Sequence, residues 1–553
     1  MPFWPKLTTL DSPAAVSATV GGRRVSESPT SNQALSLLRQ WIQDCRENHP
    51  LCARPTNCPH SGDITDFPMP TRILDVNPGE SGEIQLVVSD GTPHPYVALS
   101  HRWGKLEDVA CTTTKNISER IKQISLASLS PLFRDAVEIT RFLGIKYLWI
   151  DSLCIIQDDP EEWNQEAVRM SSTFQHAEIA ISALRSEDGS SGFLGPRYEE
   201  SVAIPFRKTA KKKIEGSILL RLGVSSFELE YGALNRRGWI FQERILPRRI
   251  LSFSNKTTYF ECQSLIRDEG SGTPWPTPRG GYASMNGPSG YRKFNSALED
   301  LAIDPNSRNR ESVFLQWRIM VQKLSELELT YERDRLPAFH GLAKRMERAV
   351  GTTYTHGLWT EDIILGLSWQ VYLWPDSEIL SPKSRSIPSW SWAASRGQQI
   401  AFLGTDRDIC LFAKLAFPRK SWDGSLELKL EAPLKTCVLS QSLATRDFDS
   451  DSKFYTEYKR SSKTVAGPLT NILEDGSGQV IGAVMVDKEP LYFDTYQCIL
   501  LYSCAGTDTQ KLNYGLLLHA VEVGKFEFER IGLVYFNSSG FFNDASRVVV
   551  TLI

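Results

Sequence analysis

Polar and aromatic side chains follow two apolar runs in the first half of the chain. PYVALS (95–100) leads into an imidazole, a guanidinium and an indole, and KYLWID (146–151) ends on a carboxylate with a thiol three residues later. In an open α/β sheet, ligands bind at the carboxyl ends of the strands, where the loops leave the sheet. The candidate binding residues there are Ser100, His101, Arg102, Trp103, Gly104, Asp151 and Cys154.

A further carboxylate lies within the stretch LNRRGWIFQERIL (234–246). If this stretch is a helix, Trp239, Glu243 and Leu246 share one face, which should be apolar, with Gln242 beside it. Glu243 is then either a structural acid, neutralised by Arg236 or Arg237, or part of a binding site. Taken alone, the pattern favours the structural interpretation.

Each strand-end residue also has a structural interpretation. Asp151 fits a loop or cap position. Cys154 could be the nucleophile of a hydrolase or transferase, but a catalytic thiol needs a partnered histidine, and a cysteine inside LWIDSLCII is usually part of the core. The chain has no GxGxxG and no GxxxxGK[ST] pattern, which argues against a Rossmann dehydrogenase and a P-loop NTPase.

Cysteines and histidines gather near the N-terminus, and both residue types bind zinc. Their spacing, C-x3-H-x2-C-x5-C-x-H, matches no standard closed site, so no metal site is predicted and the question stays open. The residues concerned are Cys45, His49, Cys52, Cys58 and His60.

Strand and helix patterns alternate from residue 95 to about 265. Ser130–Pro131 and Asp159–Pro160 are typical cap and first-turn pairs of two helices, each followed by a short apolar run. This order predicts an α/β fold with a parallel sheet flanked by helices. We expect an N-terminal arm and helical segment (1–94), the α/β domain (95–265, with an insertion at 184–230), a helical region (290–385) and a β-rich C-terminal domain (386–553).

Composition restricts the class of protein. The 553 residues are 41% hydrophobic and 23% charged, with a net charge of −3, which gives no support to binding of nucleic acid or a membrane surface. No apolar stretch approaches the roughly 20 residues that span a bilayer. Ten cysteines in so long a chain are no dense disulfide framework, so we expect a cytoplasmic protein.

Three long blocks resemble the signature segments of the fungal heterokaryon-incompatibility (HET) domain. They are YVALSHRWG, YLWIDSLCIIQDDPEEWNQEAVRMSSTFQHAEIAISA and RGWIFQERILPRRILSF, in the same order and with similar spacing. His101 and Phe174 occupy places where tyrosine is common. The family is associated with non-self recognition and programmed cell death, which implies a role as a cell-death effector with a protein partner in recognition.

The HET domain also looks distantly related to TIR domains, several of which cleave NAD. VALSHRW is similar to the first TIR strand, YLWID to the second, and GWIFQERIL to the helix that carries the catalytic glutamate four residues after a tryptophan. The resemblance implies a flavodoxin-like sheet, NAD as substrate rather than cofactor, Glu243 as catalytic residue, Trp239 and Gln242 near the substrate, and a homo-oligomer. The alternative is a non-catalytic module that signals by self-association.

Overall fold

The computed structural model describes the following regions of the chain. These are residues 6–8, 23–52, 69–79, 82–104, 110–197, 201–208, 214–221, 229, 232–270, 275–276, 294–295, 297–298, 300–301, 304, 309–329, 331–373, 387–395, 399–402, 408–416, 427–440, 470–487, 495–505, 511–522, 525–536 and 538–553. None of the helices in these residues is both long enough and apolar enough to cross a bilayer.

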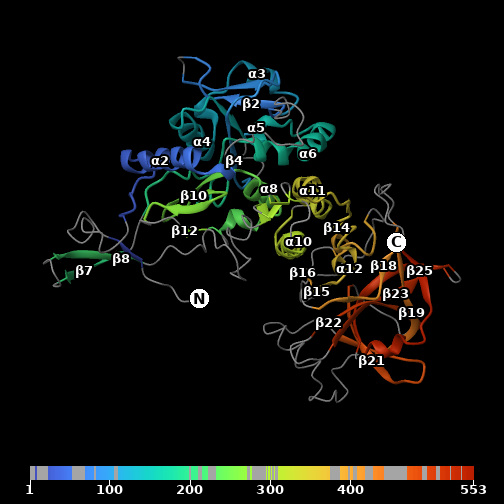
Figure 1. Cartoon of the computed structure of the whole chain (residues 1–553). Coiled ribbons are helices and arrows are strands. Elements are labelled where there is room, and N and C mark those ends of the chain that lie inside the picture. The colour runs from blue at the N-terminus through green and yellow to red at the C-terminus, as the bar shows by residue number, and fades with distance from the viewer. Residues whose placement is uncertain are drawn as a thin grey trace. The chain divides into compact units, whose positions relative to one another are not determined.

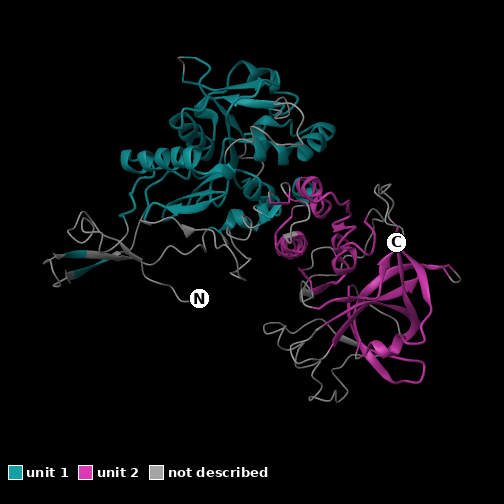
Figure 2. Ribbon diagram, viewed as in Figure 1, with its two compact units in different colours: residues 1–299, 337–342 teal, residues 300–336, 343–553 magenta. Residues whose placement is uncertain are grey.

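Two structural units make up the chain (Figure 2). Unit 1 contains residues 1–299 together with 337–342, and unit 2 contains residues 300–336 and 343–553.

Unit 1 is built around a nine-stranded mixed sheet of described strands in the order β12-β11-β10-β9-β6-β4-β5-β2-β3. Its centre is parallel: β4 pairs with β5 and β6, and β6 pairs with β9. Antiparallel strands extend both edges. The nine strands are β2 (Arg72–Asp75), β3 (Gln85–Val88), β4 (Tyr96–Ser100), β5 (Tyr147–Trp149), β6 (Ile179–Ser182), β9 (Arg249–Phe253), β10 (Thr258–Cys262), β11 (Leu265–Asp268) and β12 (Trp275–Pro276).

The central strands are buried because they are covered on both faces. Every residue of β4, β6 and β9 is buried, as expected of parallel strands that read as continuous apolar runs. The predicted α/β class with parallel pairing is therefore confirmed for the centre of the sheet, while the antiparallel edges make the whole sheet mixed.

The connections between the parallel strands are mostly helical, as predicted. α4 (Pro131–Phe142) begins at Ser130, whose hydroxyl accepts a hydrogen bond from the backbone N–H of Phe133 (3.4 Å). α6 (Pro160–His176) begins at Asp159, whose carboxylate accepts from two backbone N–H groups of the first turn. The shorter segments of unit 1 are α3 (Ile117–Lys122), η2 (Leu126–Ser128), α5 (Asp151–Cys154), η3 (Ala233–Arg236) and α8 (Ile240–Ile245).

The order of the parallel strands reverses at β4. Along the chain β4 is followed by β5 on one side of it, and then by β6 on the other. Such a reversal leaves a crevice at the carboxyl ends of the two strands, where ligands bind in open α/β sheets. Figure 1 shows β4 between α4 and α6.

One helix considered from the sequence is shorter than expected. Of the stretch 234–246, only Ile240–Ile245 is α-helical, after a separate 3-10 turn over Ala233–Arg236. Gly238 lies between the two segments, and glycine weakens a helix interior by about 1 kcal/mol. The region expected to be helical, 290–385, also contains the short helix α12 (Ile363–Gly366), which the strand β15 (Trp369–Leu373) follows.

Segments outside the central alternation also belong to unit 1. α2 (Asn32–Asn48) buries Leu38, Trp41 and Ile42, as its apolar stripe predicts, and η1 (Pro50–Cys52) follows. Within the insertion expected at 184–230, β7 (Ser201–Lys208) and β8 (Ile214–Arg221) form an antiparallel hairpin. β1 (Lys6–Thr8), in the segment expected to be a loose arm, pairs with β8.

Unit 2 combines helices with the predicted β-rich region. β19, β20, β21, β24, β23 and β22 pair in sequence, and β22 pairs again with β19, so these six strands form a closed ring. Their inward side chains form an apolar core that includes Leu473, Val484 and Phe536. The strands are β17 (Cys410–Leu411), β18 (Lys414–Leu415), β19 (Leu428–Ser440), β20 (Thr470–Glu474), β21 (Val480–Val486), β22 (Thr495–Ala505), β23 (Lys511–Ala520), β24 (Glu527–Phe536) and β25 (Arg547–Leu552).

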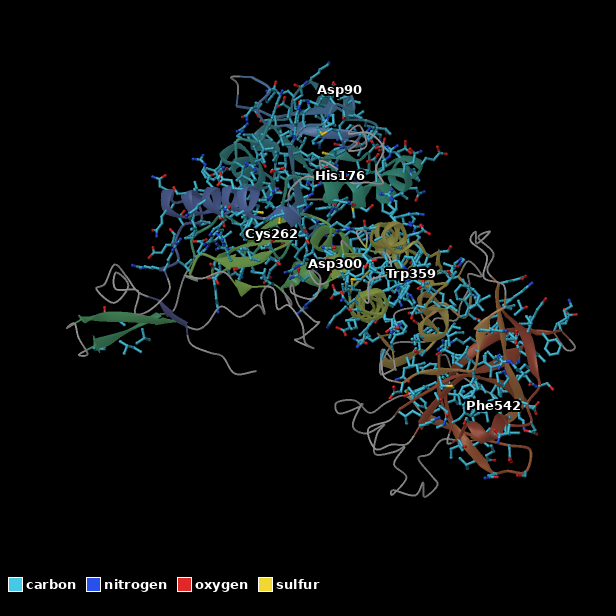
Figure 3. All side chains as sticks on the ribbon, in the orientation of Figure 1. Asp90, His176, Cys262, Asp300, Trp359 and Phe542 are labelled. Carbon is cyan, nitrogen blue, oxygen red and sulfur yellow. The ribbon has the colours of Figure 1, made fainter. Side chains whose placement is uncertain are left out.

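The remaining part of unit 2 contains several buried tryptophans. Trp317 and Trp392 both donate their indole N–H groups to the carbonyl of Gly357, at 3.1 and 3.0 Å. Figure 3 labels Trp359, which packs edge-on against Trp317. The other segments are α10 (Asn309–Ser325), η4 (Glu332–Asp334), α11 (Pro337–Val350, of which residues 337–342 belong to unit 1), β13 (Tyr354–Thr355), β14 (Leu358–Trp359), η5 (Trp392–Ala394), β16 (Gln399–Phe402) and η7 (Ser539–Phe542).

Candidate functional site

Ser100 connects the first parallel strand to the carboxylate of α8. It is the last residue of β4, and its hydroxyl donates a hydrogen bond to Oε2 of Glu243. Nη1 of Arg237 lies 3.9 Å from the other carboxylate oxygen, Oε1. The structure therefore brings together two residues that the sequence placed 143 positions apart.

Glu243 lies in a covered position. It is 6% exposed, and this burial raises the pKa of its carboxyl group above the ordinary value of 4.5. The positive charge of Arg237 and the hydrogen bond from Ser100 act in the opposite direction, because both favour the ionised form. A buried carboxylate held between a cation and a hydroxyl is suited to stabilise positive charge that develops beside it.

A second group forms around Asp151, the first residue of α5, two residues after the end of β5. The indole N–H of Trp103 donates to Oδ2 of Asp151 at 2.7 Å, and the backbone N–H of Ser152 donates to Oδ1 at 2.7 Å. Nε2 of His101 lies 3.8 Å from Oδ1. These contacts join the loops that follow β4 and β5 at the same edge of the sheet.

His101 is buried at the centre of this edge. It is 2% exposed, its ring packs edge-on against Phe133, and its Nε2 makes no hydrogen bond with the described residues. Burial lowers the pKa of His101 below 6.5 although Asp151 favours the charged form, so the imidazole is neutral at pH 7.

Arg237 links the two groups. Its Nη1 donates to the carbonyl of His101 and is the same atom that faces Glu243. The sequence suggested Arg237 only as a partner of Glu243, since nothing in the linear pattern relates it to the backbone after β4.

The comparisons with known proteins identify the part of the chain that contains this edge. Residues 96–243 match the family model of the heterokaryon incompatibility protein (HET). This chain contains a HET domain. The match begins at the first residue of β4 and ends at Glu243, so it covers every residue of the two groups described above. No curated protein and no solved structure matches the chain.

The loop after β4 in the HET domain is constrained by a close backbone contact. A side chain at Gly104 would bring its Cβ to 3.1 Å from the backbone nitrogen of Gly189, which follows β6. Hydrogen bonds from Ser190 lower the pKa of the Asp188 carboxyl group, and the charge of Arg102 adds a smaller effect in the same direction. Arg102 and Gly104 are both half-buried. Gly189 was not predicted, because only the fold brings the two loops together.

The other predicted residues of the HET domain are placed differently. Cys154 is 1% exposed, and burial raises the pKa of its thiol to about 12, so it is not activated as a nucleophile. Gln242 is buried, and its amide donates to the carbonyl of Pro337 at 2.9 Å. Trp239 is half-buried at the N-cap of α8. Contact of these three residues with a substrate stays a prediction.

Donors for a metal ion gather elsewhere. Within the described part of the chain, the group of cysteine, histidine and carboxylate ligands that is close enough to hold an ion comprises Cys45, His49, Cys52 and Cys262. All four lie outside the residues that match the HET family model.

Proposed function

We propose that the HET domain of this chain hydrolyses NAD at the bond between nicotinamide and ribose, with Glu243 as the catalytic residue, and that this activity makes the protein a cell-death effector in fungal incompatibility. One observation carries the proposal. A buried carboxylate, held by Ser100 and Arg237, lies at the carboxyl edge of the parallel strands beside the polar group of His101, Trp103 and Asp151.

The chemistry of NAD cleavage matches such a site. The bond between C1′ of the ribose and the ring nitrogen breaks with its electron pair going to nicotinamide, which leaves as a neutral molecule. Water then adds to C1′ and gives up one proton, which yields ADP-ribose. The transition state resembles an oxocarbenium ion, so a fixed negative charge near the ribose is the main requirement, and no strong general acid is needed.

The remaining residues can be assigned by their chemistry. The half-buried indoles of Trp103 and Trp239 offer flat surfaces for a base or the nicotinamide ring. Arg102 carries a guanidinium suited to a phosphate. Because Glu243 is 6% exposed, the side chains over it have to move before a ribose can reach it. We therefore expect activity to depend on an activating event, such as self-association.

The direct test of the activity is nicotinamide release. Full-length protein is incubated with NAD over a range of protein concentrations, with and without a crowding agent that promotes self-association, and products are separated by chromatography. We expect nicotinamide and ADP-ribose in equal amounts, with a rate per chain that rises with protein concentration. Absence of nicotinamide under all of these conditions would remove the enzyme proposal.

A second candidate function is a non-catalytic module that signals by self-association. It is favoured by the coverage of Glu243 and by its hydrogen bond with Ser100, which are also what a purely structural acid would show. The two functions differ in cells. A non-catalytic module would kill cells equally well with the folded Glu243→Gln variant, whereas an NAD-cleaving effector would lose both toxicity and the accompanying fall in cellular NAD.

A further inference from the structure

Four metal-binding side chains converge at one place in unit 1. Cys45, His49, Cys52 and Cys262 each offer one donor atom, and these four atoms all lie within 4.8 Å of one another. The three cysteines are buried, with exposures of 0 to 3%, and the histidine is half-buried. The three thiols are free, and neither of the sequence's other two candidates, Cys58 and His60, lies within the described residues.

Local backbone structure presents three of the four donors. Cys45 lies in the last turn of α2, and His49 is the C-cap of that helix, donating its backbone N–H to the carbonyl of Cys45 at 3.3 Å. Cys52 ends the 3-10 turn η1, and its backbone N–H donates to the carbonyl of His49 at 2.9 Å. The helix end and the turn thus fix three ligands within eight residues.

The fourth donor lies C-terminal to the HET domain in the sequence. Cys262 is the last residue of β10, 213 residues after His49, and its Sγ lies 3.4 Å from Nδ1 of His49. Figure 3 labels Cys262 in the sheet, and α2 packs against β10. The spacing of the cysteines near the N-terminus could not predict this partner.

The spacing of the donors suits a tetrahedral ion. Zinc binds thiolate sulfur at about 2.3 Å and imidazole nitrogen at about 2.0–2.1 Å, so tetrahedral geometry separates two sulfurs by about 3.8 Å and a sulfur from a nitrogen by about 3.6 Å. The distance of 3.4 Å between Cys262 and His49 is close to that value. All pairs of donor atoms lie within 4.8 Å, so small side-chain adjustments are enough to bring them to the distances of a tetrahedral site.

Arg249 provides the charge that such a site needs. It is 4% exposed, its Nε donates to Sγ of Cys45 at 3.2 Å, and its Nη2 donates to the carbonyl of Cys52 at 3.0 Å. Three thiolates and one divalent ion carry a net charge of −1, and a buried negative charge requires a partner. Nη1 of Arg249 also pairs with Oε1 of Glu178 at 3.3 Å, and Arg46 pairs with the same oxygen at 2.9 Å, so the two arginines together leave one positive charge beside the cluster.

We propose that Cys45, His49, Cys52 and Cys262 bind one zinc ion as a closed structural site. Soft thiolate donors select zinc over magnesium or calcium, and four protein ligands leave no position open for catalysis. Nδ1 of His49 is the ligand atom, since it is the nitrogen that faces Cys262.

The function of this site is to join the two flanks of the HET domain. Three ligands precede residues 96–243 and one follows them, so the ion closes a long loop that contains the whole matched segment. Closing a long loop removes more conformational entropy from the unfolded chain than closing a short one, so the ion stabilises the folded domain. The proposal is independent of NAD cleavage and stands if the enzyme proposal fails.

The test is the metal content of the full-length protein. Protein is purified without a metal-affinity step or chelator, and its metals are measured by plasma mass spectrometry. We expect close to one zinc ion per chain. A mercurial that blocks thiols should release this zinc to a coloured indicator, and cobalt in its place should give the intense visible absorption of a tetrahedral thiolate site.

Matched cysteine variants locate the ion. Cys262→Ser is expected to lower zinc content at least tenfold, whereas Cys111→Ser, a half-buried cysteine of the same unit outside the cluster, should keep it. If Cys262→Ser fails to fold, the wild-type zinc content and cobalt spectrum still decide. Wild-type protein that carries no zinc and takes none up on dialysis overturns the proposal, as does a disulfide between two of the three cysteines.

Discussion

Replacing Ser100 by alanine tests whether the strand-end group is held together as described. The substitution removes the hydroxyl that donates to Glu243, whose carboxylate is 6% exposed. The nearest cationic nitrogen, on Arg237, is 3.9 Å away and too distant for a hydrogen bond. A hydrogen bond to a charged group contributes about 1.5–3 kcal/mol. We expect the free energy of unfolding of unit 1 to fall by about 2 kcal/mol at pH 7.

The effect of Ser100→Ala should depend on pH. The hydroxyl stabilises the ionised carboxylate, so its removal raises the pKa of Glu243 further. Burial already raises that pKa above 4.5. The loss of stability is therefore largest where Glu243 is ionised, and it shrinks as the pH falls through the raised pKa and Glu243 becomes protonated.

Urea unfolding at pH 7 and pH 4.5 measures this difference, and hydrogen–deuterium exchange assigns the transition that belongs to unit 1. The matched control is Ser182→Ala, because Ser182 is paired with Ser100 at the end of the neighbouring strand β6 and is also buried. If both variants lose the same free energy, or if the loss for Ser100→Ala is equal at the two pH values, the hydrogen bond with Glu243 does not contribute as described.

Three further predictions concern buried charges. Glu243→Gln should leave unit 1 as stable as wild type or more stable at pH 7, because burial raises the pKa of Glu243 and penalises its charge. This gain in stability should vanish near pH 4.5, and urea unfolding at both pH values measures it. Burial lowers the pKa of His101, so the stability of unit 1 should fall as pH drops below 6.5, by up to about 1.4 kcal/mol per pH unit, and His101→Tyr should remove that slope in the same titration. Arg530→Leu in unit 2 should lower the free energy of unfolding by about 3–5 kcal/mol, since it removes a buried guanidinium that lies 2.7 Å from the carboxylate of Asp487 and donates to the carbonyl of Leu367 at 2.7 Å. The double variant with Asp487→Leu should recover part of the loss, and no recovery would contradict the pairing.

Much of the fold could be predicted because local signals were strong. Capped helices such as Pro131–Phe142 and buried strands such as Tyr96–Ser100 carry periodicity and cap residues within one segment. The stretch 234–246 misled because its apolar spacing is helical, while Gly238 divides it into a 3-10 turn and a six-residue helix. Periodicity gives no information about such a break.

The candidate site was predictable in its residue types but not in its contacts. The rule that ligands bind at strand ends pointed to Ser100 and Asp151, which the structure places in the two described groups. Arg237 donates a hydrogen bond to the backbone carbonyl of His101, and Cys262 joins the cysteine cluster. Both contacts depend on how distant segments of the chain come together in the fold. No linear spacing contains that information.

The rate of nicotinamide release by wild type and by two matched variants tests the assignment of Glu243 most directly. The control is Glu166→Gln. Like Glu243, Glu166 is buried, and its carboxylate accepts hydrogen bonds from the hydroxyl of Thr71 and the guanidinium of Arg169. Glu166 belongs to α6 and lies outside the strand-end group. We predict that Glu243→Gln lowers the rate on the order of 10²–10³-fold while Glu166→Gln stays close to wild type. A folded Glu243→Gln protein that releases nicotinamide as fast as wild type would contradict the assignment.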